Sequence, residues 1–219
     1  MNKILKYFFI STSILFLSAC KSFKNQSIET DDKSYISDFE LIQRNIRNDS
    51  IIRINSPKAI INQITNDFEI FDSSIELSNT IDNKLQINSG RSTLNNSQNI
   101  IKVFNNVNIN LQNNPSSFIR TQSLSWNLGR SLISLTSPLE LNLKNTKIIS
   151  ESGLYNIDTN QLKLNNNIFT RSVNNINGLN NYQIEIVSDV ALWSKDNNLL
   201  EFKSNEKQVE STINFLGTE

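Results

Sequence analysis

One short pattern returns five times along the chain, at a spacing near thirty residues. The copies begin with a hydroxyl residue, at Ser56, Ser89, Thr121, Ser150 and Ser188, and each continues as an apolar stretch, a polar turn and a second apolar stretch. Repeats with a period of about 20 to 50 residues are typical of stacked units that bury their apolar faces against one another. The sequence therefore predicts a fold built by repetition of one hairpin.

Apolar and polar residues alternate after the turn of every copy. Phe68 and Ile70 flank Glu69, for example, and a period of two places alternate side chains on opposite faces of a strand. A second apolar pair follows a further polar stretch in several copies, which predicts another turn between the pairs. The chain therefore reads as an all-β meander of antiparallel hairpins. The first pairs of the other copies are Ile101 and Val103, Ile133 and Leu135, Leu162 and Leu164, and Leu200 and Phe202; the second pairs are Ile75 and Leu77, Val107 and Ile109, and Leu139 and Leu141.

Asparagine accounts for about one residue in six, whereas there are only five glycines. Biased genome composition is one explanation. Asparagine also tolerates the left-handed backbone conformation that tight turns require, so it can replace glycine there. We expect the pairs Asn95–Asn96, Asn105–Asn106 and Asn113–Asn114 to turn the chain.

The N-terminus has the layout of an export signal. Lys3 and Lys6 precede an apolar run over residues 7–17, which is short for a membrane span. The run ends in Leu-Ser-Ala-Cys at residues 17–20, which resembles the lipobox of bacterial lipoproteins, and Cys20 is the only cysteine. An ordinary signal peptide with a chance cysteine is the alternative. We predict a lipoprotein signal peptide at 1–19, an acylated Cys20 with a polar tether at 20–34, and one folded domain at 35–219.

Several kinds of chemistry lack their residues. The chain has no histidine, and acylation of Cys20 leaves no thiol, so histidine-based triads and the usual zinc sites are excluded. No glycine-rich phosphate loop occurs, and no cofactor is expected. The chain has 21 basic and 21 acidic side chains, and loss of Lys3 and Lys6 with the signal leaves a net charge of about −2, which does not favour nucleic acid as a partner.

Two residue sets have a functional and a structural interpretation. A glycoside hydrolase could use the carboxylates of Glu69 with Asp72, or of Asp189 with Asp196, but a solvated strand face and turn positions explain them better. The second set is Trp126 and Trp193, which are more often core residues than ligand platforms. They occupy the position of the repeat at which the other copies have Ile61, Leu94 and Tyr155.

The repeats resemble those of the LptC-like lipopolysaccharide-export proteins, the LptC/LptA/OstA family. The resemblance rests on Ala59-Ile60-Ile61 with Phe68-Glu69-Ile70, on Ala191-Leu192-Trp193 with Leu200-Glu201-Phe202, and on the opening segment at 35–41; it covers 35–219. It implies a single folded-over antiparallel β-jelly roll (β-taco) of about 12–16 strands whose apolar inner face forms a groove for acyl chains. Periodicity alone equally allows a closed sandwich with a dry core.

The resemblance implies a function without catalysis. A periplasmic bridge protein of this family receives lipopolysaccharide, or a related glycolipid, from an inner-membrane ABC transporter and passes it to an LptA-type bridge protein. The expected partner edges are Phe39 and Leu41 at the N-terminal side, and Ile213 and Phe215 in a terminal strand near 209–215. The expected groove residues are Ile54, Ile61, Phe68, Ile70, Ile87, Leu94, Ile101, Val103, Trp126, Ile133, Leu135, Leu164, Trp193 and Phe202.

The N-terminus departs from the family. LptC proteins are typically held by an uncleaved transmembrane helix, whereas Cys20 predicts a lipid anchor. Lys21 after it is not the acidic inner-membrane retention signal of some bacteria, so the anchor fits either membrane, with the inner one favoured by the resemblance. The competing hypotheses are a non-catalytic structural or assembly lipoprotein with a sealed β core, and a carbohydrate-active enzyme on a repeat β scaffold.

Overall fold

The computed structural model describes residues 33–45, 50–78, 85–111, 117–143, 146–173, 181–205 and 208–216. The chain divides into Met1–Asp31 and Asp32–Glu219, and every described residue belongs to the second unit. The predicted signal peptide, Cys20 and most of the tether lie outside the described residues, as does the expected turn at Asn113–Asn114.

All regular structure in the described residues is β-strand, and it forms one antiparallel sheet of 13 strands. The prediction of an all-β, single-sheet fold built from hairpins is therefore confirmed. No stretch of the described residues forms a helix long and apolar enough to cross a membrane. The strands are β1 (Lys33–Asn45), β2 (Ser50–Asn62), β3 (Phe68–Ser78), β4 (Leu85–Asn95), β5 (Ile100–Asn110), β6 (Ser117–Asn127), β7 (Leu132–Leu135), β8 (Leu139–Leu143), β9 (Thr146–Asn156), β10 (Gln161–Val173), β11 (Asn181–Ser194), β12 (Leu199–Lys203) and β13 (Glu210–Leu216).

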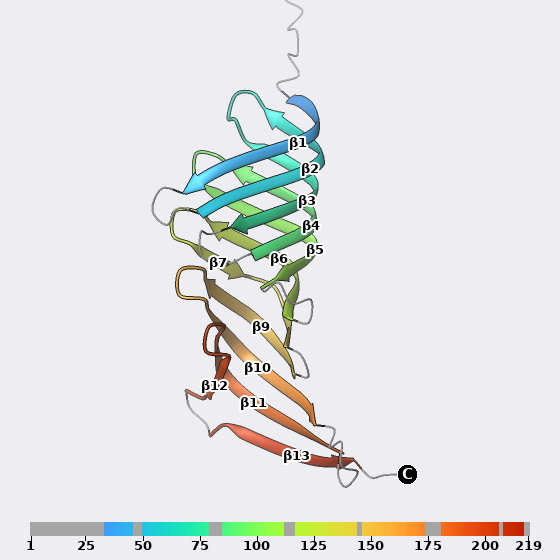
Figure 1. The fold of residues 1–219 in the computed structure, drawn as a ribbon, viewed down its shortest axis with the longest axis vertical. Helices are drawn as coiled ribbons and strands as arrows, with labels where there is room; N and C mark the ends of the chain where they lie inside the picture. The colour runs from blue at the N-terminus through green and yellow to red at the C-terminus, as the bar shows by residue number, and fades with distance from the viewer. Residues whose placement is uncertain are drawn as a thin grey trace, which may run out of the picture. The chain divides into compact units, whose positions relative to one another are not determined.

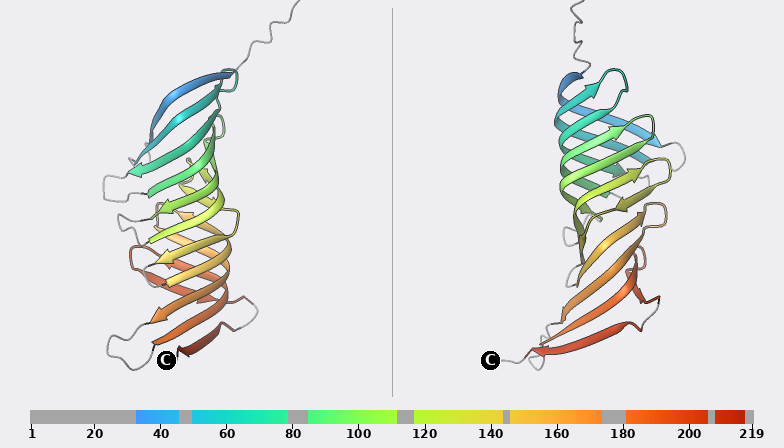
Figure 2. Two further views of the ribbon diagram at one scale, coloured as in Figure 1. Left: turned by 90° about the vertical axis from the view of Figure 1, so that its right-hand side faces the viewer. Right: turned by 180° about the vertical axis from the view of Figure 1, so that it is seen from behind.

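The strands follow one another across the sheet in chain order (Figures 1 and 2). Two places depart from this simple meander. Short strands β7 and β8 share one position, because each pairs with a different half of β6 and β9. At the C-terminal edge β12 and β13 likewise pair with different halves of β11. The terminal strand expected near 209–215 is β13, and β1 forms the opposite edge.

The polar stretches expected to be turns between apolar pairs are, in β3 and β5, bends within a single long strand. Asp72 in β3 and Asn105 and Asn106 in β5 have φ values of 49°, 63° and 55°, so they are left-handed residues inside the strands. The register shifts at the same point in β5. The shift marks a β-bulge in β5, which bends the strand without ending it. In β3 the register with both neighbours is the same on the two sides of Asp72, so the strand continues through that residue as well. The expectations of turns at Asn105–Asn106 and at Asp72 were therefore wrong. Of the three second apolar pairs, the pair Leu139 and Leu141 does follow a break, at residues 136–138 between β7 and β8.

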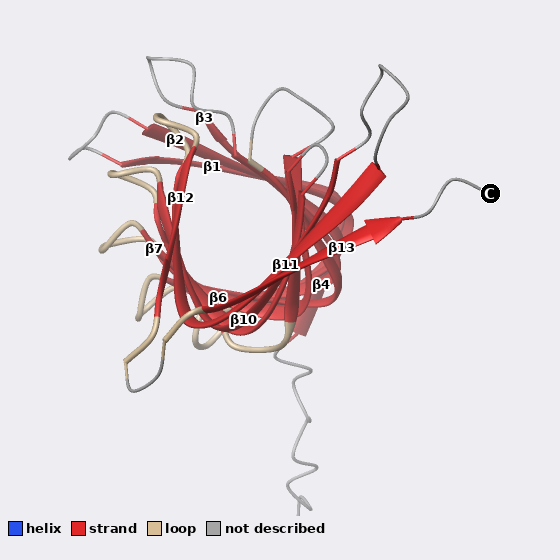
Figure 3. Ribbon diagram, turned by 90° about the horizontal axis from the view of Figure 1, so that it is seen from below, coloured by secondary structure: helices blue, strands red, loops and turns tan. Residues whose placement is uncertain are grey.

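The hydroxyl residue that opens each repeat lies at this bend, and all five are buried. Ser56 donates to the carbonyl of Phe71 on the neighbouring strand. Ser150 donates to the carbonyl of Asn165 on its neighbour at 2.7 Å. We call the row of bends the fold line, because the sheet bends there and curls around its interior (Figure 3). The five hydroxyl residues are Ser56, Ser89, Thr121, Ser150 and Ser188.

Left-handed residues also close the hairpins at the other end of each repeat. Asn99, Ser131 and Asn160 have φ values of 51–52° and end successive turns. The carbonyl of each accepts a hydrogen bond from the first residue of the next turn, at 3.0 Å from Leu128, Ile157 and Lys195 respectively. Asparagine thus does replace glycine in most of these turns, including the one expected at Asn95–Asn96. The hydrogen bonds hold consecutive turns in a stack.

Candidate functional site: the apolar interior of the sheet

The inward side chains form rows that cross the sheet, because the register places equivalent residues directly opposite one another. The first row, which we call the tryptophan ladder, lies near the stacked turns and contains both tryptophans. Each residue of this row stands directly opposite the next one on the neighbouring strand. Its members, from β2 to β12, are Ile61, Phe68, Leu94, Ile101, Trp126, Ile133, Tyr155, Leu162, Trp193 and Leu200.

The next row inward combines large and small residues. Ala59, Ser92, Gly153 and Ala191 stand on the first strand of their repeats, opposite large side chains on the second strand. We call this row the small-residue ladder. An alternation of large and small side chains lets neighbouring rows interdigitate, which is how interiors reach close packing. Its members from β1 to β12 are Ile36, Ala59, Ile70, Ser92, Val103, Leu124, Leu135, Gly153, Leu164, Ala191 and Phe202.

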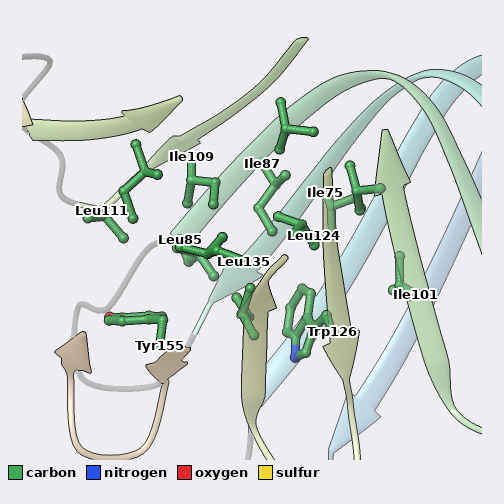
Figure 4. Close-up of a cluster of buried hydrophobic side chains, with 14 of the residues drawn as sticks. Ile75, Leu85, Ile87, Ile101, Ile109, Leu111, Leu124, Trp126, Leu135 and Tyr155 are labelled. Atoms are coloured by element: carbon green, nitrogen blue, oxygen red, sulfur yellow. The ribbon is translucent and has the colours of Figure 1, made fainter. Parts of the chain in front are cut away.

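A third row lies beyond the fold line, and we call it the isoleucine ladder. It is apolar at every position from β1 to β11. Figure 4 shows Ile75, Ile87 and Ile109 of this row pointing into the same interior as Leu124 and Trp126. All three rows contribute to one hydrophobic cluster. The members are Leu41, Ile54, Ile75, Ile87, Ile109, Ile119, Leu141, Ile148, Phe169 and Ile186.

Every residue predicted to line the groove belongs to one of these three ladders. All are buried except Ile61, Phe68 and Phe202, which are half-buried. Several members of the isoleucine ladder were not predicted to line the groove, among them Ile109, Ile119 and Ile148. The signal for Ile109 was its place in a second apolar pair, Val107 and Ile109, which the alternation assigned to a separate strand rather than to the far half of the same strand. Ile119 and Ile148 belong to no such pair.

The interior is closed in the middle of the sheet and less covered at its two ends. Val103, Ile101 and Leu164 in the middle have no exposed surface. Near the N-terminal edge, half-buried Phe68 contacts Phe39 with ring centroids 5.2 Å apart. Near the C-terminal edge, half-buried Phe202 contacts Phe169 edge-on at 5.0 Å. Other half-buried residues that pack on the cluster at these ends are Ile36, Leu41, Ile184, Ile186 and Leu200.

The expected partner edges are the strands at the sheet's two sides. Phe39 and Leu41 lie in β1, but their side chains face the interior, and Phe39 is buried. Ile213 and Phe215 lie in β13, opposite Ile184 and Tyr182 of β11. Ile213 is on the inward face and is 55% exposed, because β13 is an edge strand among the described strands. At the N-terminal edge, therefore, the backbone of β1 rather than these two side chains is what a partner could contact.

Both tryptophan side chains are core residues, at 1% exposure each. Their indole N–H groups have no hydrogen-bond acceptor among the described residues. Tyr155, which stands between them in the ladder, does have one: its hydroxyl donates to the Oδ1 of Asn160 at 3.0 Å, and Asn160 donates to Asp196 at 2.9 Å. A buried donor without an acceptor costs about 1–3 kcal/mol, so the two indoles are polar positions in an otherwise apolar row.

The carboxylates proposed for a hydrolase have structural partners. Glu69 forms an ion pair with Arg91 at 2.6 Å. Asp189 accepts hydrogen bonds from Ser204 and from the backbone of Asn205, both at 2.8 Å, and Asp196 accepts from Asn160. Asp72 is an exposed, left-handed residue inside β3. In the part of the chain that the structure describes, no three acidic residues gather as a metal site.

No family model matches the sequence, and no curated protein matches it. Among solved structures, the chain is similar to LptH from Pseudomonas aeruginosa, the LptA homologous periplasmic component of the conserved lipopolysaccharide transport device. The TM-score is 0.42 and the sequence identity 10%, over 62% of this chain and 95% of that chain.

Proposed function

We propose that this chain is a periplasmic bridge protein that carries lipopolysaccharide, or a related glycolipid, along the apolar interior of its sheet. It does so without catalysis. The observation that carries the proposal is the isoleucine ladder, which runs from Leu41 in β1 to Ile186 in β11 with an apolar residue at every position. The row offers a continuous apolar surface along which a hydrocarbon chain can move from one end of the sheet toward the other.

The energy of solvation explains why such a path matters. Each methylene group moved from water into apolar surroundings gains about 0.8 kcal/mol, so ten methylenes exposed to the periplasm would cost on the order of 8 kcal/mol. A lining that accepts the acyl chains throughout the transfer removes this barrier. Because the lipid is equally well solvated in the membrane that it leaves, the lining supplies a path and no direction.

Access begins at the ends of the sheet. Phe68 and Phe202 are half-buried, whereas the middle of the lining is closed by its own side chains. An acyl chain therefore enters beside these end residues and displaces side chains as it advances. The bulge at Asn105–Asn106 shifts the register of β5 against both of its neighbours, so the two halves of this strand can separate there with little loss of backbone pairing.

The partners follow from the open edges and from the family resemblance of the repeats. β1 and β13 each pair on one side only among the described strands, and such edges accept a further strand from another protein. β1 docks on the permeases of an inner-membrane ABC transporter, whose ATP hydrolysis supplies direction. β13 continues the sheet into an LptA-type bridge protein. An acylated Cys20 holds the protein at a membrane, in the inner one for this order of partners.

Photo-crosslinking in living cells tests the path, with neighbouring residues of opposite orientation as matched controls. Phe68 faces inward and Glu69, the next residue, faces outward; Phe202 and Glu201 form a second such pair. A crosslinking amino acid at Phe68, Val103, Trp126 or Phe202 is expected to give glycolipid adducts, and at Glu69 or Glu201 to give none. Equal adducts at inward and outward positions, or none at any position, would refute the path.

The second candidate is a structural or assembly lipoprotein of the cell envelope with a sealed core. It is favoured by the near-complete burial of Val103, Trp126 and Leu164. The same experiment separates the two functions, since a sealed core gives no lipid adduct at any inward position while the protein still folds and reaches the envelope.

A further inference from the structure

Three aliphatic side chains form a row on the outer face of β9, β10 and β11, and we call them the outer aliphatic row. Ile149 stands directly opposite Ile168, and Ile168 stands directly opposite Val187. Each is the chain neighbour of a member of the isoleucine ladder, so alternation along the strand turns it away from the interior. The three side chains are 47%, 45% and 44% exposed, which leaves a contiguous apolar surface in water.

The repeat does not require aliphatic side chains at this place. The same row continues from β8 to β1 through residues that are all polar, and on the other side it ends at Glu210 of β13. The aliphatic stretch is therefore specific to β9, β10 and β11, and contiguous exposed apolar surface is typical of interaction sites. The polar members, from β8 to β1, are Glu140, Arg120, Asn108, Asn88, Ser74, Asn55 and Glu40.

The next outward row on the same three strands has a positive charge at one side and a negative charge at the other. Lys147 of β9, Thr170 of β10 and Glu185 of β11 stand opposite one another. Lys147 forms an ion pair with Glu140 at 2.8 Å. Glu185 has no cation within ion-pair distance among the described residues. A partner that covers the outer aliphatic row therefore gains a salt bridge if it brings a cation to β11.

We propose that the partner is a second copy of this chain, bound face to face about a two-fold axis close to the direction of β10. Such an axis places β9 of one copy over β11 of the other, and β10 over β10. Ile168 then lies over Ile168 of the second copy, and Ile149 over Val187. In the next row Lys147 lies over Glu185. The surface is thus complementary to itself in both apolar contacts and charge, as an isologous interface requires.

The geometry of twisted sheets limits the size of this contact. Two sheets that pack face to face cross at about 30° and diverge toward their corners, so the contact centres on β9, β10 and β11. Glu140 and Glu210, which flank the outer aliphatic row, stay at the rim in water. Because only three strands take part, the buried area is below the roughly 800 Å² per partner of a standard interface, and the dimer dissociates on dilution.

The ion pair of Lys147 with Glu140 does not prevent the second salt bridge. An ammonium group has three N–H donors, so one lysine binds a carboxylate of its own chain and another from the second copy. The interior of the sheet and the backbone edges of β1 and β13 remain uncovered in this dimer. The dimer is therefore independent of the proposed lipid path.

Photo-crosslinking in living cells identifies the occupant of the surface. Two versions of the full chain with different tags are produced together, each with a crosslinking amino acid in place of Ile168. An adduct that contains both tags is expected. Lys163, outward on the same strand beyond the fold line, and Asn88, in the polar part of the same row, are the control positions and should give no such adduct. An Ile168 adduct only with lipid or with another protein, or equal dimer adducts at the control positions, would overturn the proposal.

Charge exchange tests the two-fold arrangement, with sedimentation equilibrium of the full chain in density-matched detergent as the measurement. Lys147→Glu and Glu185→Lys are each expected to raise the dimer dissociation constant at least about tenfold, because like charges then face each other. An equimolar mixture of the two variants should dimerise as well as wild type, since every such contact in the mixed dimer joins opposite charges. Lys163→Glu, outside the surface, should leave the dissociation constant unchanged.

Thermal unfolding shows that each variant is folded. Should Lys147→Glu fail to fold, Ile168→Ser decides, since loss of the central apolar contact is expected to raise the dissociation constant at least about tenfold. A wild-type chain that stays monomeric, a mixture no stronger than the single charge variants, or wild-type dimerisation of Ile168→Ser would refute the dimer.

Discussion

Ser150 and Ser188 both stand directly opposite Asn167, one on each neighbouring strand of β10, and both are buried. They hold the same position in consecutive repeats. The hydroxyl oxygen of Ser150 lies 2.7 and 2.8 Å from the carbonyl oxygens of Asn165 and Ser152, which share its one proton as acceptors, and it accepts from the N–H of Asn165 at 3.1 Å. The hydroxyl of Ser188 has no partner among the described residues. Two serines at the same position of the repeat therefore contribute different numbers of hydrogen bonds to the stability of the sheet.

Ser150→Ala is expected to lower the free energy of unfolding by about 1–3 kcal/mol, because it leaves the part-buried N–H of Asn165 without its side-chain acceptor and removes the buried hydroxyl's own bond to a carbonyl. Ser188→Ala is expected to change it by less than about 0.5 kcal/mol, since the hydroxyl it removes is unsatisfied. Urea unfolding followed by circular dichroism measures both values.

The two variants serve as controls for each other, because burial, residue type and place in the repeat are the same. A loss for Ser188→Ala equal to that for Ser150→Ala would show that the hydrogen bonds at the fold line do not stabilise the sheet, and that the small hydroxyl residue is kept there for its size.

The hydroxyl at the start of each repeat was visible in the sequence, whereas its place at a bend was not. The pattern of Phe68, Glu69 and Ile70 correctly predicted a half-buried strand and its inward face. The same pattern could not show that β3 continues through Asp72. A polar residue of high turn propensity looks the same in the sequence whether it bends a continuous strand or ends it in a turn. Only pairing with β2 and β4 on both sides of Asp72 decides between them.

The small-residue ladder gives a second prediction. A Cβ atom added at Gly153 would lie 3.0 Å from Leu164 Cδ2, 3.2 Å from the carbonyl oxygen of Lys163 and 3.3 Å from Leu135 Cδ1. Because the backbone of β10 cannot yield as a side-chain tip can, Gly153→Ala is expected to cost about 1–3 kcal/mol of unfolding free energy. Thermal unfolding provides the measurement.

Gly129→Ala is the matched control, since its added Cβ would have only an ordinary contact, 3.5 Å from Asn127 Oδ1. It is expected to stay within about 0.5 kcal/mol of wild type. If both glycine variants lose equally little stability, β7, β9 and β10 are not closely packed around Gly153, and the proposed clash is wrong.

Tyr155 links the tryptophan ladder to the stacked turns. Tyr155→Phe keeps the ring in the core but leaves the buried Oδ1 of Asn160 without its donor. We expect a loss of about 1–2 kcal/mol in unfolding free energy. Tyr35→Phe, at a tyrosine that is 67% exposed, should change it by less than about 0.5 kcal/mol. A neutral Tyr155→Phe would mean that the link contributes no stability.

The same hydroxyl predicts a pH dependence. Burial, with a smaller contribution from Asp196, raises the pKa of Tyr155 above its ordinary value near 10. The folded state therefore holds this proton more tightly than the unfolded state, so the stability it provides is complete below about pH 10 and is lost as the pH rises above that value. Urea unfolding at pH 8 and pH 11 should show a larger loss for wild type than for Tyr155→Phe; equal losses would contradict the link.

The edges of the sheet were predictable as strands, but the exposure of their inward faces was not. Ile213 in β13 lies on the inward face, opposite Ile184, as Ile109 does in the middle of the sheet. One is 55% exposed and the other 2%, and the difference depends on how many strands follow. Sequence periodicity assigns a face to a side chain, whereas burial depends on neighbours that only the assembled sheet supplies.

The exposed edge gives the last prediction, which rests on the proposed bridge function. Ile213→Pro removes one backbone N–H from β13 and fixes φ, which impairs addition of a partner strand. Because the described side chains of β13 are exposed, the fold should survive with little change in its unfolding temperature. Capture of an LptA-type bridge protein should fall at least about tenfold. Ile213→Thr, which retains the N–H and a strand-forming residue, should capture it as well as wild type. Capture by the proline variant at the wild-type level would show that the partner binds elsewhere, and loss in the threonine variant would show that it binds the side chain rather than the strand.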